Sequence, residues 1–451
     1  MTENGNQKRP VRTLEVENFS VIKKARLEFG RITVLIGPQA SGKSLLCKLA
    51  YFLGGEVIEV AVESLMNRNS WEEFLKTAGR EFSSRFSTAG WLRKNCKVSF
   101  SSQQYSAMLR GAGDPVSPEL ELVFGDEFER LYIAISRNPA KQPSVATMTP
   151  SERQALRQDL WVELSLLLNK KRTQTNIYIP SGRAFFTDLA RAISTLERPG
   201  LDLITRRFGG QITWDSRWKV GLLTTGRDVV PEIEKEMQQI AGGVVAVVND
   251  RPVFLTFDGR SLPLSQLSSG TLEVLPMFNV LIRQAFELEH IYVYARAASR
   301  EVSPLADVSE HSPLIYLEEP EANIFPDTQR ELVNLFAWMA NDPVLSFDWI
   351  ITTHSPYILT AFNTLIEAQR AAKKTGKRDQ VAAIVPEHNW VSEDDFAAYA
   401  IQDHVATSIF KKAAKGTEGS GLIDGDYLDN VSDTTSNQFS RLVEIELADA
   451  T

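Results

Sequence analysis

The sequence predicts an α/β protein in which helices flank a mixed β-sheet. Three apolar runs have the continuity of strands buried on both faces of a sheet, within Ile32–Ile36, Pro313–Glu319 and Trp349–Pro356. Helical patterns of apolar residues occupy Leu45–Leu53 and the segment from Leu272 to Leu281. The strands end in polar residues, and α/β sheets bind ligands at the carboxyl ends of their strands.

The first strand leads into a glycine-rich loop. Residues Gly37 to Ser44 read GPQASGKS, the G-x-x-x-x-G-K-[ST] pattern of a nucleotide-binding P-loop. Backbone N–H groups of such a loop curl around phosphates at the start of a helix. The candidate nucleotide contacts are therefore Gly37, Pro38, Gln39, Ala40, Ser41, Gly42, Lys43 and Ser44. Lys43 would reach the β- and γ-phosphates and Ser44 would bind Mg²⁺. The strand before and the helix after disfavour the alternative, a simple Gly/Ser turn.

Two adjacent carboxylates end the second strand, which reads PLIYLEE over Pro313–Glu319. We expect this strand beside the P-loop strand, with Glu318 on Mg²⁺ and Glu319 as the general base that activates water. The alternative is a buried strand with two solvated acids at its end. It is disfavoured because adjacent buried carboxylates repel each other unless a cation joins them.

The third strand ends at His354 in WIITTHSP, where an imidazole can reach a γ-phosphate oxygen. Alone, it would be read as a structural histidine. A fourth motif, LSSGT at Leu267–Thr271, opens a helix, and Ser268, Ser269 and Gly270 can form an anion nest there. Alone, this motif is only a good helix N-cap. The preceding motifs favour the functional reading of both.

The order GPQASGKS, LSSGT, IYLEEPE, TTHSP resembles the ATP-binding-cassette (ABC) ATPases, in particular their soluble SMC, Rad50, RecF and OLD branch. The opening strand with Asn18 and Phe19, followed by a short hairpin, is similar to the same branch. The resemblance implies a P-loop NTPase fold of ABC type, with ATP and Mg²⁺ as cofactors. It also implies a homo-oligomer, at least a head-to-tail dimer, in which Ser268, Ser269 and Gly270 complete the ATP site of a second copy.

The chain departs from that pattern at several positions. Glu318 stands where the family usually has Asp, and Gln39 stands where Asn is common; both keep the needed chemistry. The strand Asn176–Pro180 lies where a glutamine-bearing loop belongs but is followed by Ser181-Gly182-Arg183. Arg183 is predicted to be a phosphate or interface contact or, with equal weight, a surface charge. Weaker candidates for the loop glutamine are Gln103 and Gln104.

We expect the ATPase core to be interrupted by an α+β insert lobe. The predicted segments are an N-terminal core over 1–62, an insert over 63–250, a second core part over 251–375 and a small C-terminal region over 376–451. In the insert we predict strands at Lys97–Phe100, Leu120–Val123 and Leu131–Ser136 and a helix over Pro150–Lys171, capped by Thr149 or Ser151.

Composition indicates an ordinary globular protein of 451 residues and net charge −8, which disfavours a surface built uniformly for nucleic acid. No run approaches the roughly 18 apolar residues of a membrane span. Two cysteines indicate a reducing, cytoplasmic setting, with Cys47 as a small buried hydrophobe. Between Trp71 and Arg110, seven basic residues face three acidic ones, which predicts a solvated basic face over an aromatic core or, with less weight, an anion-binding patch.

The C-terminal region superficially matches a Toprim nuclease at Glu387 and Asp424-Gly425-Asp426, but it is short for that domain. The YIPSGR segment and the overall size resemble the ATPase subunit of the PARIS anti-phage defence system. That resemblance implies a sensor that holds and releases a separate Toprim nuclease, a larger ring-like oligomer such as a hexamer, and an acidic phage protein or DNA as trigger. The alternative is a RecF-like DNA-repair ATPase. A transporter subunit is disfavoured by the LEVENF opening and the insert.

Overall fold

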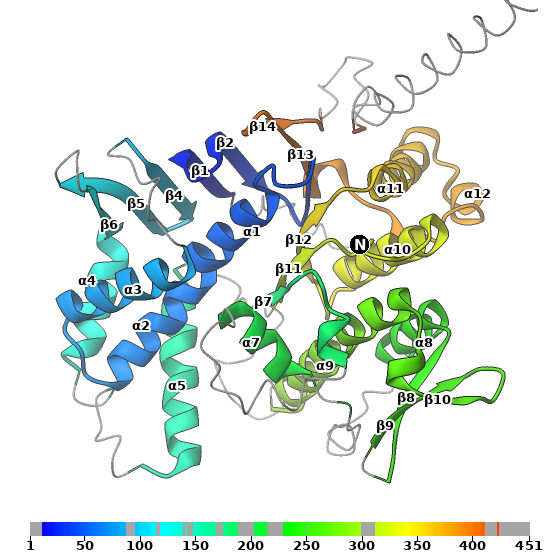
Figure 1. Ribbon diagram of the computed structural model, residues 1–451, viewed down its shortest axis with the longest axis horizontal. Helices are drawn as coiled ribbons and strands as arrows, with labels where there is room; N and C mark the ends of the chain where they lie inside the picture. Colours follow the sequence, from blue (N-terminus) through cyan, green and yellow to red (C-terminus); the bar gives the residue numbers. More distant parts are fainter. Residues whose placement is uncertain are drawn as a thin grey trace, which may run out of the picture.

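The computed structural model describes residues 11–86, 95–113, 118–138, 141, 148–167, 175–187, 203–212, 214, 229–249, 251–298, 312–410 and 422–423. An eleven-stranded sheet runs through it in the order β6-β5-β4-β1-β2-β14-β13-β3-β12-β11-β7 (Figure 1). Its strands are β1 (Arg12–Phe19), β2 (Ile22–Phe29), β3 (Ile32–Ile36), β4 (Lys97–Ser102), β5 (Tyr105–Gly113), β6 (Pro118–Phe124), β7 (Asn176–Ile179), β11 (Leu314–Glu318), β12 (Asp348–Thr353), β13 (Phe396–Gln402) and β14 (Val405–Ser408).

The sheet has a parallel and an antiparallel part. Strands β13, β3, β12, β11 and β7 run parallel to one another, whereas each neighbouring pair among β6, β5, β4, β1 and β2 is antiparallel. Strand β14 joins the two parts, antiparallel to β13 and parallel to β2. The expected mixed α/β sheet with flanking helices is confirmed.

The central strands are covered on both faces. Every residue of β3, β11 and β12 is buried, which explains their continuous apolar sequences. Because side chains alternate along a strand, Val34 packs into a core with helices α8 (Val229–Ala241) to α11 (Pro356–Thr375). Leu35 packs into the opposite core with helices α1 (Lys43–Tyr51) to α5 (Pro150–Ser165).

The helices and smaller elements complete the layers on either side of the sheet (Figure 1). They are α1 (Lys43–Tyr51), a π-helix (Phe52–Glu56), α2 (Val57–Met66), α3 (Trp71–Arg85), α4 (Asp126–Ser136), α5 (Pro150–Ser165), α7 (Leu203–Gln211), α8 (Val229–Ala241), α9 (Ser269–Ala298), α10 (Pro326–Asn341), α11 (Pro356–Thr375) and α12 (Arg378–Ala382). A second sheet has the order β10 (Ser261–Pro263), β9 (Arg251–Thr256) and β8 (Gly243–Val248).

Several local predictions can be compared with these elements. The strands expected at Lys97–Phe100 and Leu120–Val123 are confirmed as β4 and β6, but Leu131–Ser136 is wrong because it is the second half of helix α4. Helix α5 begins as predicted, with the Thr149 hydroxyl accepting from the Glu152 N–H in a capping box. It ends at Ser165 rather than Lys171, and residues 168–171 lie outside the described part of the chain.

The sheet takes strands from all four expected segments. In particular, β13 of the region 376–451 pairs directly with the P-loop strand β3, so this region is part of the same sheet as the P-loop strand. The boundary expected at residue 250 falls between β8 and β9, two strands that pair with each other. The lobe formed by α2 to α5 and β4 to β6 continues the main sheet instead of standing apart from it (Figure 1).

Candidate functional site

The P-loop connects β3 to α1 and is shaped by two glycines. A Cβ on Gly37 would lie 2.5 Å from the carbonyl oxygen of Ile401 in β13, so no larger residue fits there. Gly42 has a φ of 104°, and its Cβ would lie 2.3 Å from Ile22 Cδ1. The loop therefore takes its form from β13 and β2, which the motif itself does not contain.

Lys43 is folded into the P-loop. Its ammonium donates hydrogen bonds to the carbonyl oxygens of Gly37 and Pro38 at 2.8 and 2.9 Å. The side chain is buried, and burial lowers the pKa of its ammonium, while Glu319 and other carboxylates nearby partly offset that shift. These two bonds hold the ammonium against the loop that the P-loop pattern assigns to phosphate.

Glu318 ends β11 with both carboxylate oxygens held. The Tyr178 hydroxyl donates to Oε1 at 2.7 Å, and the Ser181 N–H donates to Oε2 at 3.2 Å. The sequence predicts that β11 lies beside β3, but in the structure β12 lies between these two strands. The strand carrying His354 therefore separates the P-loop strand from the carboxylate strand, and that predicted adjacency is wrong.

Glu319 lies beyond the strand end, in contact with His354. Its φ is 44°, an unusual left-handed conformation for a residue with a side chain. Its N–H donates to the Thr352 carbonyl at 2.8 Å. His354 Nε2 lies 3.2 Å from Glu319 Oε1, and Nδ1 lies 3.4 Å from Lys43 Nζ. The structure thus brings together Lys43, Glu319 and His354, which the sequence places in three separate motifs.

Glu321 is a further carboxylate of this cluster that the sequence analysis did not single out. It accepts a hydrogen bond from the His354 N–H at 2.6 Å, and burial raises the pKa of its carboxyl group. A signal for it existed, since Glu321 lies only two residues after Glu319 in LEEPE. Tyr178 was also missed. Tyr178 of β7 is paired with Tyr316 of β11, and Tyr316 lies two residues before Glu318. Because side chains alternate along a strand, Tyr178, Tyr316 and Glu318 lie on the same face of the sheet.

The serine-rich motif opens helix α9. Ser268 caps this helix by accepting from the Thr271 N–H at 3.1 Å, and both Ser268 and Ser269 are exposed. Gly270 is buried against the loop that follows Glu319: its Cβ would lie 2.7 Å from Asn323 O and 3.0 Å from Ile324 Cγ2. The serine motif therefore packs against the loop after β11, which also contains the predicted base Glu319.

Arg183 is not a surface charge, so that prediction is wrong; the other alternative, a phosphate or interface contact, stays a prediction. Its side chain has 0% exposure, and its donors are engaged by the carbonyl oxygens of Pro180, Glu273, Glu318 and Glu319. The glutamine candidates do not reach the site either. Gln103 and Gln104 lie in the β4–β5 turn, where Gln104 donates to Glu127, on the antiparallel side of the sheet.

The basic stretch and the cysteines can also be placed. Arg85 is buried between Glu56 and Glu81, and Arg110 pairs with Glu121. The expected aromatic core is present, with Phe82 and Phe86 packed on Phe19, while Trp91, Arg93 and Lys94 lie outside the described residues. Cys47 is buried, as predicted, and burial raises the pKa of its thiol.

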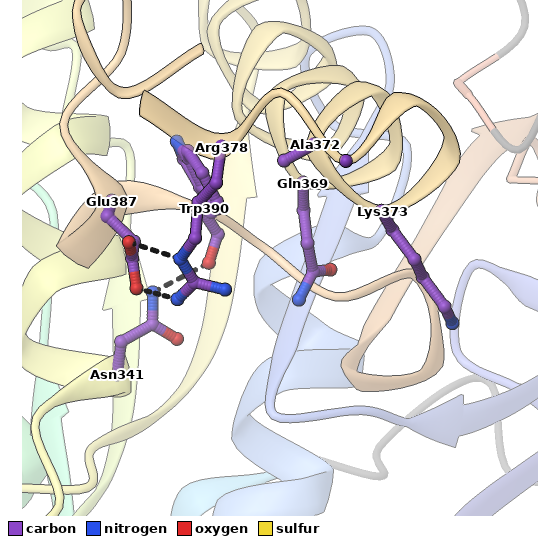
Figure 2. A pocket seen from close by; sticks show the side chains of 8 residues that line it. Asn341, Gln369, Ala372, Lys373, Arg378, Glu387 and Trp390 are labelled. Atoms are coloured by element: carbon purple, nitrogen blue, oxygen red, sulfur yellow. Dashed lines mark hydrogen bonds and ion pairs between the residues drawn. The ribbon is translucent and has the colours of Figure 1, made fainter. Parts of the chain in front are cut away.

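A cavity of about 640 Å³ lies away from these motifs, at the C-terminal end of α11 (Figure 2). Its wall includes Glu387, the residue with a superficial match to a Toprim nuclease, which is ion-paired with Arg378, while Asp424 and Asp426 lie outside the described residues. The lining residues are Asn341, Gln369, Ala372, Lys373, Gly376, Arg378, Glu387 and Trp390. None of them belongs to the nucleotide motifs.

Among the described helices, none combines the length and apolarity needed to cross a membrane.

A family model, AAA_15, "AAA ATPase domain", matches residues 210–359, which include the serine motif, the Glu318–Glu319 pair and His354. This part of the chain is therefore similar to an ATPase domain. The solved structures that it resembles include an SMC head domain from Thermotoga maritima (9% identity, 88% of this chain and 98% of that one, TM-score 0.36) and one from Pyrococcus furiosus bound to part of ScpA (13%, 89% and 96%, 0.32). Another is an ATP-binding cassette of an ABC transporter (9%, 88% and 89%, 0.28). No curated protein matches the sequence.

Proposed function

We propose that this chain is a Mg²⁺-dependent ATP hydrolase in which Lys43 binds the phosphates, Glu319 is the general base and His354 reaches the γ-phosphate. The observation that carries the proposal is the contact of His354 with both Lys43 and Glu319, at 3.4 and 3.2 Å. A group that touches the phosphate-binding lysine and the predicted base lies where an attacking water and a γ-phosphate would meet.

The protein groups available for Mg²⁺ are the Ser44 hydroxyl and the Glu318 carboxylate. Both are oxygen donors, which Mg²⁺ prefers, and Mg²⁺ in nucleotide sites needs only one or two protein ligands besides the phosphates. The hydrogen bonds from Tyr178 and Ser181 fix the Glu318 carboxylate in one orientation. When bound, the ion would neutralise charge on the β- and γ-phosphates.

We further propose that two copies enclose ATP head to tail, with Ser268 and Ser269 of one copy facing the P-loop of the other. Support comes from the exposure of both serines and from the contact of Gly270 with the loop after Glu319. In this arrangement the partner's serines would add hydroxyl groups and a helix N-terminus to the phosphate site.

Turnover measured together with assembly tests this proposal. Glu319→Gln should lower hydrolysis by about 10²- to 10⁴-fold, the usual contribution of a general base, while ATP stays bound and light scattering shows more assembled protein. Glu331→Gln on α10 is the matched control and should hydrolyse ATP at the wild-type rate. Hydrolysis by Glu319→Gln at the wild-type rate would remove Glu319 from its assigned role.

For the biological role, we propose a cytoplasmic anti-phage sensor that holds and releases a separate Toprim nuclease. Support comes from the YIPSGR resemblance and from the overall size of the chain. Purification of the tagged chain from cells carrying its neighbouring genes should retain a nuclease; its consistent absence would count against this role.

The second candidate role is a RecF-like ATPase that clamps DNA. The exposed Lys76, Arg80 and Lys97 favour it, whereas the engagement of Arg85 and Arg110 by carboxylates reduces the basic surface. This role predicts ATP-dependent DNA binding that weakens steeply with salt. Lack of DNA binding by Glu319→Gln at low salt with ATP would exclude it.

A further inference from the structure

A buried arginine lies between the serine-motif helix and the predicted base. Arg183 follows β7, and its guanidinium donates to the carbonyl oxygens of Glu318 at 2.6 Å and Glu319 at 2.9 Å. It also donates to Pro180 O and to Glu273 O, both at 3.0 Å. One side chain therefore holds the ends of β7 and β11 and the start of α9.

The acidic partner of Arg183 belongs to α9. Glu273, which is 3% exposed, lies four residues after Ser269, and its Oε2 accepts from the Arg183 N–H at 3.0 Å and lies 3.5 Å from Nε. The Thr187 hydroxyl adds a bond to Leu272 O at 3.3 Å. The segment after β7 is thus attached to the first turns of the helix that presents the exposed serines.

Burying this cation is costly unless its donors are engaged. Burial lowers the pKa of Arg183, and the neighbouring carboxylates, Glu273 foremost, oppose that shift. One of its hydrogen bonds goes to the carbonyl oxygen of Glu319, a residue in a strained backbone conformation. Glu319 has a φ of 44°, a conformation that costs free energy for a non-glycine residue and persists only where the surroundings enforce it.

Two bonds enforce this conformation of Glu319. Its N–H donates to Thr352 O in β12, and its carbonyl accepts from Arg183 Nη2. With its peptide groups held on both sides, the side chain is directed to His354 Nε2. A shift of α9 would move Glu273, and with it the guanidinium that fixes the Glu319 carbonyl.

We propose that Arg183 is a positioning residue for ATP hydrolysis, which couples helix α9 to the backbone of Glu319. When a second copy engages Ser268 and Ser269, a shift of α9 would reach the general base through Glu273 and Arg183. The inference rests on the function proposed above and adds the residues through which the serine motif acts on the reaction.

The test is a comparison of Arg183→Lys in two backgrounds. Lysine keeps the charge but cannot reach four carbonyl oxygens at once, so kcat should fall by about 10²-fold, the cost of a misplacement of about 1 Å. The dissociation constant of a fluorescent ATP analogue should stay within about twofold. In the Glu319→Gln background, Arg183→Lys should cause no further loss of kcat, because Arg183 acts only through Glu319.

Two further variants keep the test decisive. Glu273→Gln has nearly the same shape and should fold if Arg183→Lys does not; it should lower kcat about tenfold with the same dependence on Glu319. Arg85→Lys also replaces a buried, ion-paired arginine and should lower the melting temperature but leave kcat unchanged. Losses that add fully in the Glu319→Gln background, or wild-type kcat in both Arg183→Lys and Glu273→Gln, would overturn the inference. If Glu319→Gln itself hydrolyses ATP normally, the proposed function fails instead.

Discussion

His354 Nε2 lies 3.2 Å from Glu319 Oε1, so the imidazole contacts the carboxylate that is the predicted base. The other ring nitrogen, Nδ1, lies 3.4 Å from Lys43 Nζ. An ammonium group can only donate, so a hydrogen bond from Lys43 to Nδ1 requires the ring proton on Nε2, which would then be donated to Glu319. His354 therefore connects the predicted phosphate-binding lysine to the predicted base, and a change at Lys43 should affect both binding and the reaction.

Lys43→Ala should weaken ATP binding by at least about 10²-fold. The ammonium would make charge-assisted hydrogen bonds to phosphate, and bonds of this kind contribute about 1.5–3 kcal/mol each. Calorimetric titration with ATP and Mg²⁺ gives the dissociation constant. Lys374→Ala, an exposed lysine at the end of α11, is the control and should bind as the wild type does. Unchanged affinity in Lys43→Ala would mean that the P-loop does not hold the phosphates.

Tyr178→Phe should raise the Mg²⁺ concentration required for hydrolysis. Burial raises the pKa of Tyr178 well above 10, so its hydroxyl stays neutral and donates to Glu318 Oε1. Without that donor a buried carboxylate oxygen is left unsatisfied, which should also cost about 1–3 kcal/mol of stability. Activity measured against Mg²⁺ concentration, with a melting curve, checks both effects.

Tyr316→Phe separates the two effects of Tyr178→Phe. Tyr316 is equally buried on the neighbouring strand, but its hydroxyl donates to Ala50 O at 3.3 Å and not to Glu318. It should lose stability with no change in the Mg²⁺ requirement. The same Mg²⁺ dependence in both variants would show that Tyr178 does not orient a metal ligand.

Glu321→Gln should raise the melting temperature at neutral pH. Burial raises the pKa of Glu321 above 4.5, so the folded state binds its proton more tightly than the unfolded state does. Its negative charge therefore costs stability above the folded-state pKa, and the cost disappears as the pH falls below about 4.5. Melting curves between pH 4 and pH 8 should show a gain that shrinks to nothing at the acid end. A difference of constant size over this range would contradict the electrostatic origin.

The sequence alone predicts the three strands that carry motifs, because β3, β11 and β12 are apolar runs that end at the P-loop, the Glu318–Glu319 pair and His354. It did not predict their order, since the insertion of β12 between β3 and β11 depends on pairing between distant segments. Helix α4 was misread because Leu131–Ser136 is rich in β-formers. The buried Phe128, Tyr132 and Ile135 show the helical spacing only when the segment is read from Asp126.

The contacts of Arg183 could not be predicted from the sequence. The YIPSGR segment indicated an unusual position, but no local pattern shows that four carbonyl oxygens from three elements converge on one guanidinium. The same holds for Gly270. Its motif indicates an anion nest, whereas its packing against Asn323 is visible only once α9 and the loop after β11 are placed together.

Gly270→Ala should separate ATP binding from assembly and hydrolysis. The added Cβ would lie 2.7 Å from Asn323 O, closer than real contacts allow, so the turn bearing Ser268 and Ser269 must move off the loop. We expect ATP affinity within about twofold of the wild type, loss of the ATP-dependent oligomer, and turnover lower by about 10²-fold, as expected for a misplaced catalytic group. Light scattering with and without ATP, beside a turnover assay, measures these quantities.

Gly79→Ala on α3 is the matched control, because a Cβ there meets nothing within 4 Å. Alanine favours a helix over glycine by about 0.5–1 kcal/mol, so this control should melt slightly higher and hydrolyse ATP normally. An ATP-dependent oligomer that survives Gly270→Ala would contradict the proposed sandwich, because its serines could then not be the groups that close the site. An oligomer lost equally in Gly79→Ala would instead place the contact between copies on the α3 side of the molecule.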